Sequence, residues 1–222
     1  MQPVDNMNYE AARHQMLSQQ IRTWDVLDER VLKTLRQTPR EAFVPESEHD
    51  LAFADTEIPL AHDQWMMTPK IEARVLQELA IEPTDVALEI GTGSGYLAAC
   101  LSRLAGRVVS LEIFADLSES AGERLKRASI ANVELRDEDA MHANFDTQFD
   151  VIAITASLPA LPERFIQLLK PEGRLFVVVG RPPVMDATLV RLHADGSWTE
   201  KSVFETLLTP MINADQPEAF VL

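Results

Sequence analysis

The stretch LEIGTGSGY, residues 88–96, decides the fold of this chain. It joins a short apolar run, residues 86–90, to a segment with helical spacing that begins at Tyr96. Its three glycines let the backbone turn tightly and approach a ligand closely, and the free N–H groups at a helix start favour polar or anionic ligand groups. The stretch therefore predicts a strand, a ligand-binding loop and a helix. For the loop alone, a tight turn without a ligand is the alternative.

Strand and helix patterns alternate from about residue 84 to residue 205. Further strands are predicted at residues 107–111, 133–136, 149–155 and 173–179, and helices at residues 96–104, 115–128 and 162–169. Asp195-Gly196 separates two more runs, residues 187–193 and 198–205, and is a strong hairpin signal. The pattern predicts an α/β fold with a doubly wound, mostly parallel sheet and a C-terminal antiparallel hairpin.

Residues 1–80 lack this alternation and have sequence patterns typical of helices and loops. Residues 9–24 have helical spacing, and Asp28 suits the cap of a second helix that ends at Pro39. Prolines within residues 43–69 predict extended or looped chain, and Thr68-Pro69 resembles an N-cap followed by a first-turn proline. We therefore expect an N-terminal helical extension, residues 1–80, packed on a main domain, residues 81–222, in one structural unit.

Composition and charge exclude several classes of protein. The 222 residues are 46% apolar and 25% charged, which suits a globular domain. Twenty Lys and Arg against 35 Asp and Glu give a net charge of −15, which disfavours nucleic acid and anionic membranes as partners. A single cysteine and five histidines without metal-binding spacing predict no disulfide framework and no metal site. Without a secretory signal or a membrane-length apolar stretch, we expect a cytoplasmic location.

An acidic residue at the end of the second predicted strand narrows the class of ligand that the glycine loop can bind. Glu112 lies 21 residues after Gly91, where a carboxylate can accept hydrogen bonds from both hydroxyls of a ribose. The glycine spacing differs from the dinucleotide pattern, which has two residues between its second and third glycines, and no P-loop lysine follows. The loop and Glu112 together therefore indicate a nucleoside ligand of another kind.

The compact Gly-x-Gly-x-Gly loop after an acidic residue resembles the cofactor loop of S-adenosylmethionine-dependent methyltransferases. The resemblance implies S-adenosyl-L-methionine as the cofactor, bound by residues 81–222 in a Rossmann-like domain. Asp139 fits the usual adenine-contacting acid of that superfamily, and a solvated loop acid is the alternative. The cofactor-binding residues that the resemblance implies are Glu89, Gly91, Thr92, Gly93, Ser94, Gly95, Glu112, Asp139 and Ala140.

A longer match narrows the resemblance to one family. DERVL at residues 28–32 and PREAFVP at residues 39–45 resemble the N-terminal signature of the protein-L-isoaspartate O-methyltransferases, which generic methyltransferases lack. The cofactor loop is also similar to theirs, and residues 149–150, 154–156, 169–171 and 173–175 match their later motifs. The resemblance implies a cytosolic repair enzyme that methylates the abnormal carboxylate of isoaspartyl residues in damaged proteins, after which the ester collapses to a succinimide.

The match fails within the loop that the resemblance assigns to the substrate. The family's Gln-Thr-Ile-Ser-Gln-Pro is replaced here by QWMMTP, residues 64–69, so Met67 stands where the family has a serine that orients the substrate carboxylate. Methionine cannot donate that hydrogen bond. Thr68 comes one residue late, and an N-cap role is its alternative. The resemblance implies catalytic positions at Gln64, Met67 and Thr68 and substrate-loop positions at His62, Trp65 and Met66.

The loss of one donor predicts a weakened enzyme or a changed substrate. The substrate carboxylate is already the nucleophile of an in-line displacement, so positioning and water exclusion can supply catalysis without a general base. A hydrogen bond to a charged group contributes roughly 1.5–3 kcal/mol, on the order of 10- to 100-fold in rate. Trp65, Met66 and Met67 suit an apolar small-molecule pocket or plain core packing. A methyltransferase with a changed substrate and a non-catalytic cofactor-binding protein are therefore the alternatives.

Overall fold

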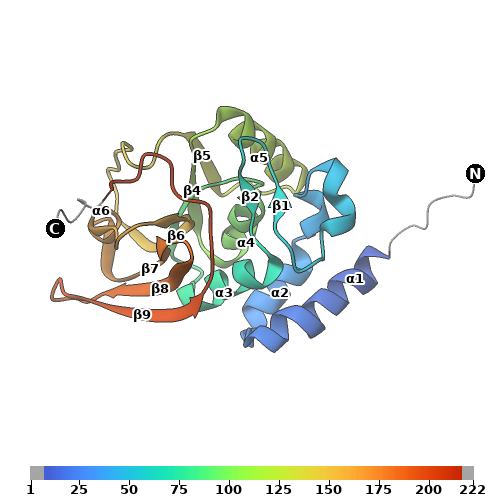
Figure 1. The fold of residues 1–222 in the computed structure, drawn as a ribbon, viewed down its shortest axis with the longest axis horizontal. Coiled ribbons are helices and arrows are strands. Elements are labelled where there is room, and N and C mark those ends of the chain that lie inside the picture. The colour runs from blue at the N-terminus through green and yellow to red at the C-terminus, as the bar shows by residue number, and fades with distance from the viewer. Residues whose placement is uncertain (1–7, 217–222) are drawn as a thin grey trace, which may run out of the picture.

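The computed structural model describes residues 8–216 and has a seven-stranded sheet at its centre (Figure 1). The strands are β3 (Val86–Ile90), β4 (Arg107–Glu112), β5 (Val133–Asp137), β6 (Phe149–Leu158), β7 (Leu169–Arg181), β8 (Val184–Leu192) and β9 (Trp198–Glu205). They lie in the order β5-β4-β3-β6-β7-β8-β9, parallel from β5 to β7 and antiparallel at β8 and β9. The predicted mostly parallel α/β sheet with a C-terminal antiparallel hairpin is confirmed.

The chain changes direction across the sheet between β3 and β6. From β3 it adds β4 and β5 on one side, then returns to add β6 and β7 on the other side. In register, Ile90 lies opposite Leu111 on β4 and opposite Ile154 on β6. The loops after these three strands therefore leave the same edge of the sheet, and open α/β sheets bind ligands at such a switch point.

Helices cover both faces of the sheet, because successive strand residues point to opposite faces. The helices are α1 (Tyr9–Gln15), α2 (Glu29–Gln37), α3 (Pro69–Leu79), α4 (Tyr96–Leu104), α5 (Ala115–Arg127) and α6 (Glu163–Ile166). One apolar cluster joins Ala87 and Val108 to α2, α3, α4 and α5, and a second joins Leu88 and Val109 to α6. Among the described residues, no helix has both the length and the apolar character needed to cross a membrane.

The N-terminal helices share the core of the sheet. Residues 9–24 are helical throughout, as predicted, although α1 continues as a π-helical turn and a 3-10 turn. The carboxylate of Asp28 accepts a hydrogen bond from the backbone N–H of Arg30 at 2.7 Å, which confirms the predicted cap of α2. Leu32 and Leu35 of α2 are buried in the same cluster as α3 and α4.

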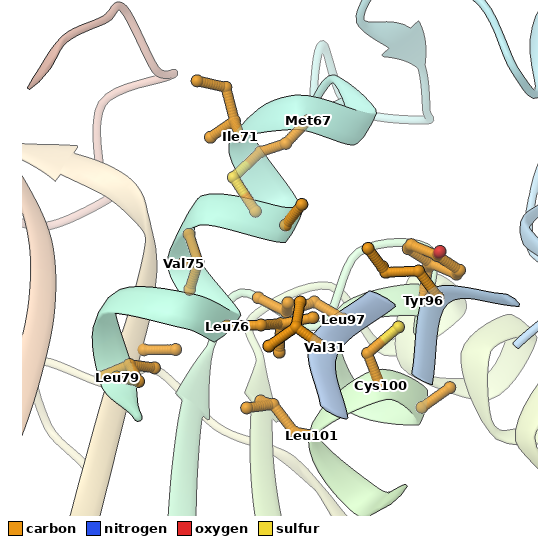
Figure 2. Close-up of a cluster of buried hydrophobic side chains, with 14 of the residues drawn as sticks. Val31, Met67, Ile71, Val75, Leu76, Leu79, Tyr96, Leu97, Cys100 and Leu101 are labelled. Carbon is orange, nitrogen blue, oxygen red and sulfur yellow. The ribbon is translucent and has the colours of Figure 1, made fainter. Parts of the chain in front are cut away.

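Helix α3 packs its apolar residues against α4 and α2 (Figure 2). Met67, directly before α3, and Ile71 belong to this buried cluster, and Cys100 of α4 is fully buried in it. Thr68 occupies the predicted N-cap position, but its side chain makes no cap hydrogen bond. Its hydroxyl is buried without a hydrogen-bond partner among the described residues.

Two segments differ from the sequence prediction. Helix α6 has four residues instead of the predicted 162–169, because Leu169 pairs with Phe149 and already belongs to β7. Within residues 43–69, β1 (Ile58–Pro59) and β2 (Trp65–Met66) form a short antiparallel hairpin where only extended or looped chain was predicted. The hairpin turn has His62 at φ +59° and Asp63 at φ +54°, a conformation that side chains other than glycine rarely adopt.

Candidate active site

A hollow opens at the switch point between β3 and β6. It holds about 800 Å³ of space, open solvent included, which suits a cofactor-sized ligand. The ends of β3, β4 and β6 line it, together with the loop after β5, the β1–β2 hairpin and residues 208–212. Seven residues that the sequence analysis singled out are part of this lining: Gln64, Trp65, Gly91, Gly93, Glu112, Asp139 and Ala140.

The glycine loop brings its backbone close to this hollow. Gly91 has φ +97°, and a side chain there would overlap the hydroxyl of Thr155 on β6. That hydroxyl donates to the carbonyl oxygens of Ile90 at 3.0 Å and Gly91 at 2.9 Å. Gly95, at φ +83°, precedes α4 and lies against Ala121 of α5. The loop is therefore held by contacts that leave no room for a side chain at Gly91.

Glu112 ends β4 with its carboxylate beside the glycine loop. One carboxylate oxygen accepts a hydrogen bond from the backbone N–H of Gly93 at 2.8 Å. The other accepts from the N–H groups of Ile113 at 3.0 Å and Phe114 at 3.2 Å. Three backbone donors therefore fix the position of the Glu112 carboxylate in the hollow.

Asp139 and Ala140 line the hollow after β5. The Asp139 carboxylate accepts from the N–H of Met141 at 2.9 Å and from the side-chain amide of Asn213 at 2.8 Å, and it lies 2.8 Å from Nδ1 of His142. Partial burial raises the pKa of Asp139, but the hydrogen bonds from Asn213 and His142 outweigh burial and hold that pKa below its usual range. Asp139 is therefore an oriented anion that links this loop to the C-terminal segment.

Four of the predicted cofactor residues do not line the larger hollow: Glu89, Thr92, Ser94 and Gly95. Glu89 is fully buried on β3 and accepts a hydrogen bond from the hydroxyl of Ser110. The Ser110 hydroxyl is also 2.6 Å from that of Thr92. Ser94 accepts from the N–H of Tyr96 at 3.2 Å at the start of α4. Glu89, Thr92 and Ser94 instead line a second, smaller pocket.

This second pocket holds about 310 Å³ of space, open solvent included. It adjoins the first hollow, because Leu60, Trp65, Gly91, Gly93 and Thr155 line both. The remaining lining combines apolar side chains with two buried carboxyl groups: Met66, Met67 and Leu97 with Glu72 and Glu89, besides Thr92 and Ser94. A substrate group that reaches this pocket would lie next to a ligand in the larger hollow.

The predicted substrate loop is divided between the two pockets. Gln64 lines the larger hollow and donates to the carbonyl oxygen of His62 at 2.9 Å. Trp65 is half exposed where the pockets meet, whereas Met66 and Met67 are buried and line the smaller pocket. The two methionines are also part of the core, which agrees with plain core packing, and an apolar small-molecule pocket stays a prediction. The lining of neither pocket includes Thr68.

His62 lies outside both pockets and connects the hairpin to α5. Its Nε2 atom is 2.8 Å from the carboxylate of Asp116, and its ring stacks on Phe114 with centroids 4.1 Å apart and planes at 3°. The hydrogen bond from His62 holds the pKa of Asp116 below its usual range. Because Phe114 lines the larger hollow, His62 fixes the hairpin relative to that lining.

A buried ion pair holds the end of the substrate loop. Arg40, in the N-terminal motif, pairs with Glu72 of α3, and both side chains are almost fully buried. Arg40 also donates to the carbonyl oxygens of Ala52 at 2.9 Å and Met67 at 2.7 Å. Burial raises the pKa of Glu72, and the charge of Arg40 opposes that shift. The pair therefore determines where the backbone of Met67 lies.

The sequence analysis missed several residues of the larger hollow. Residues 208–212 reach it from the far end of the chain, anchored by hydrogen bonds between Ser157 and the backbone of Thr209 and Met211, both 2.9 Å. Their only sequence signal was their position after the last strand. Thr155 lies within residues 154–156, where the family motif implies no role for it, and the apolar Ile113 and Phe114 directly follow Glu112.

Comparison with known proteins decides the family. A family model described as Protein-L-isoaspartate(D-aspartate) O-methyltransferase (PCMT) matches residues 11–216. The chain belongs to the PCMT family. The match includes the N-terminal motifs at residues 28–45 and the C-terminal segment beside the hollow. The resemblance predicted from those motifs is therefore confirmed.

Members of the PCMT family from bacteria and archaea match most of the chain. A Protein-L-isoaspartate O-methyltransferase of Rhodopseudomonas palustris is 34% identical over 209 residues, 91% of this chain and 95% of its own length. That of Methanoculleus marisnigri is 38% identical over 181 residues, 81% of each chain. A solved structure from Plasmodium falciparum, assigned to the PCMT class and in complex with S-adenosyl-L-homocysteine, shares the fold with a TM-score of 0.79. It is 21% identical and covers 92% of this chain and 98% of its own.

Proposed function

We propose that this chain transfers a methyl group from S-adenosyl-L-methionine to the carboxylate of isoaspartyl residues in proteins or peptides. Membership of the PCMT family supports the reaction class. The observation that carries the proposal is the contact between Glu112 and the glycine loop at the switch point, beside a second pocket under the substrate loop. A cofactor and an acceptor would then lie side by side.

The residues of the larger hollow suit this cofactor. S-Adenosyl-L-methionine supplies an electrophilic methyl group on a positively charged sulfur. The described lining contains the carboxyl groups of Glu57, Glu112, Glu138 and Asp139 and no lysine or arginine, which favours a cationic ligand. Glu112 would hold the ribose hydroxyls, and Asp139 with Ala140 would hold the adenine end. The backbone of Gly91, where a side chain cannot fit, would allow close approach.

The protein's own contribution to the reaction is positioning. An isoaspartyl carboxylate is ionised at neutral pH and needs no general base to attack a methyl group. Trp65, where the two pockets meet, would cover the reacting groups and exclude water. Gln64 lines the same hollow and would contact the acceptor from the hairpin. Arg40 donates a hydrogen bond to the Met67 carbonyl group and pairs with Glu72 of α3, and so fixes the end of the loop relative to α3.

Methyl transfer from labelled S-adenosyl-L-methionine tests the proposal. The acceptors are an isoaspartyl peptide and the matching normal aspartyl peptide, and cofactor binding is measured by calorimetry on the same protein. We expect transfer to the isoaspartyl peptide alone. Cofactor binding without transfer to either peptide would contradict the proposed acceptor. The cytoplasmic location expected from the sequence stays a prediction, which fractionation of the producing cells would test.

One observation favours a second candidate, a methyltransferase with an apolar small-molecule acceptor. Trp65, Met66 and Met67 give the smaller pocket a largely apolar wall. A screen of small carboxylic acids and hydroxyl compounds with the same labelled cofactor distinguishes this candidate, because it would give transfer to a small molecule and none to the peptide. A non-catalytic cofactor-binding protein would give binding and no transfer in either assay.

A further inference from the structure

The smaller pocket contains two buried carboxyl groups whose surroundings differ. Glu72 and Glu89 both line it, together with Met66 and Met67, and both are almost fully buried. Glu72 contacts the guanidinium of Arg40, which favours its ionised form. Glu89 has no ion-pair partner among residues 8–216. Two neighbouring buried carboxyl groups that share one cation do not both ionise readily.

The third carboxyl group of this region, Glu112, has more hydrogen-bond donors than Glu89. Glu112 accepts hydrogen bonds from three backbone N–H groups. Burial raises the pKa of Glu89 to about 8. The hydrogen bond from the Ser110 hydroxyl lowers this pKa, and the charges of Glu112 and Glu72 raise it. The backbone N–H of Ala98 also lowers it, by a smaller amount.

Burial raises the pKa of Glu72 to about 8 as well. Glu72, however, lies against the guanidinium of Arg40, whereas Glu89 has no ion-pair partner in the described part of the chain. Of these two carboxyl groups, we therefore expect Glu89 to keep its proton at neutral pH.

Hydrogen bonding decides which oxygen of Glu89 carries that proton. Ser110 donates its hydroxyl hydrogen to Oε2 of Glu89, and Thr92 is placed to donate in turn to Ser110. Because Oε2 serves as an acceptor, the proton belongs on Oε1. Oε1 is buried and makes no hydrogen bond of normal length and angle among the described residues, although the backbone N–H of Ala98 lies near the Glu89 carboxyl group. A buried O–H group without an acceptor is unfavourable, and an oxygen atom of a ligand in the pocket would relieve this.

We propose that Glu89 is a catalytic residue which, as a neutral carboxylic acid, donates a hydrogen bond from Oε1 to the acceptor carboxylate. This inference rests on the proposed function, since it assumes a carboxylate acceptor. Met67 lines the same pocket and cannot donate a hydrogen bond. Glu89 supplies the missing donor from a different element, since it lies on β3 directly before the glycine loop. A carboxylic acid that stays neutral inside an apolar site can serve as such a donor.

Two substitutions at one position test the protonation state. Glu89→Gln keeps the shape and a donor but cannot ionise, whereas Glu89→Ala removes the donor. At pH 7 we expect Glu89→Gln to keep kcat for the isoaspartyl peptide within about 3-fold and Glu89→Ala to lose about 10- to 100-fold. Wild-type kcat/KM should fall above about pH 8 as Glu89 ionises, and Glu89→Gln should lack this fall.

A matched control and a spectroscopic measurement keep the test decisive. Glu134→Gln removes an exposed carboxylate on β5 that pairs with Arg107, and it should leave both kcat and the alkaline fall unchanged. Thermal melts and cofactor binding verify each variant. Infrared difference spectra of the wild-type protein supply a readout that does not depend on activity. They should contain a protonated-carboxyl band at pH 7 that disappears above about pH 8, and the loss of this band in Glu89→Gln assigns it to Glu89 and not to Glu72.

The possible failures can be told apart. The role of Glu89 is overturned if the Glu89→Gln variant folds and binds the cofactor but has no activity. It is also overturned if that variant keeps the fall in kcat/KM above about pH 8. In both cases the activity of the wild-type protein still supports the proposed function. The absence of a protonated-carboxyl band at pH 7 also overturns the role of Glu89. If wild-type protein binds the cofactor but methylates no isoaspartyl peptide, the proposed function fails and this inference fails with it.

Discussion

The glycine loop and the β1–β2 hairpin face the same hollow, but different kinds of contact hold them in place. The loop is connected directly to β3 and α4, and the backbone N–H groups of Gly91 and Thr92 donate to the carbonyl oxygen of Leu111 on the neighbouring strand. The hairpin has two residues in each strand and depends on side chains from distant segments. His62 joins it to α5, and Arg40 holds the carbonyl group of Met67.

This difference separates the two tasks of a methyltransferase. Cofactor binding relies on elements that are consecutive in sequence, where strand ends meet at one edge of the sheet. The hairpin, which we propose positions the acceptor, relies on contacts between residues 27 to 54 positions apart in the chain, which change more easily without loss of the fold. Substitutions in the loop should therefore abolish cofactor binding, whereas substitutions in the hairpin should alter the handling of the acceptor.

The largest effect is expected for Gly91→Ala. The new methyl group would overlap the Thr155 hydroxyl at a residue with φ +97°, so the loop must move. We expect the Kd for S-adenosyl-L-methionine to rise by about 100-fold or more, measured by calorimetry.

Gly196→Ala is the matched control for that substitution. Gly196 has φ +83° in the turn between β8 and β9, and no atom lies within 4 Å of the added methyl group. The left-handed conformation should cost about 1–2 kcal/mol of stability and lower the Tm by roughly 2–8 °C, with cofactor affinity unchanged. Equal cofactor binding by both variants would contradict a special role for the loop.

The next effect is expected for Glu112→Ala. This substitution removes the acceptor of the Gly93 N–H group and of the proposed ribose contacts. We expect cofactor Kd to rise about 10- to 100-fold, as for hydrogen bonds to a charged group. The control is Glu123→Ala, an exposed residue of α5 paired with Arg127. A change in Kd below about 3-fold for Glu112→Ala would show that its carboxylate serves only the loop.

A smaller effect is expected for His62→Ala in the hairpin. The change removes the stacked contact with Phe114 and the hydrogen bond to Asp116. The KM for the isoaspartyl peptide should rise about 2- to 10-fold, with kcat changed less, because the hairpin loses its tether while the cofactor loop is intact. His193→Ala, in the β8–β9 hairpin, is the control and should leave KM unchanged. An unaltered KM in His62→Ala would remove His62 from acceptor positioning.

The smallest effect is expected for Met67→Ser. If Glu89 already donates to the acceptor, a hydroxyl at position 67 should change kcat/KM by less than about 3-fold. In the Glu89→Ala background the same hydroxyl should restore part of the lost activity. A gain of 10-fold or more from Met67→Ser alone would show instead that the wild-type pocket lacks a donor. Steady-state kinetics of the two single variants and the double variant form the required cycle.

The sequence predicted the parts of the fold whose signals are local. The strand before the glycine loop and helix α4 after it have the predicted bounds, because apolar spacing and glycines specify both. Helix α6 was predicted too long because pairing with Phe149 on β6 draws Leu169 into a strand. The β1–β2 hairpin was missed because its turn uses His62 and Asp63 in a left-handed conformation, for which the chain has no glycine signal.

The residue types of the candidate site were determined by the sequence alone, and their distribution between two pockets was decided by the tertiary structure. Glycines after a strand and an acid after the next strand are local features of a parallel sheet, so they are readable without coordinates. The ion pair of Arg40 with Glu72, the approach of residues 208–212 and the free oxygen of Glu89 depend on segments far apart in the chain. Burial and neighbouring charge set the protonation of a carboxyl group, and both arise only when the chain folds.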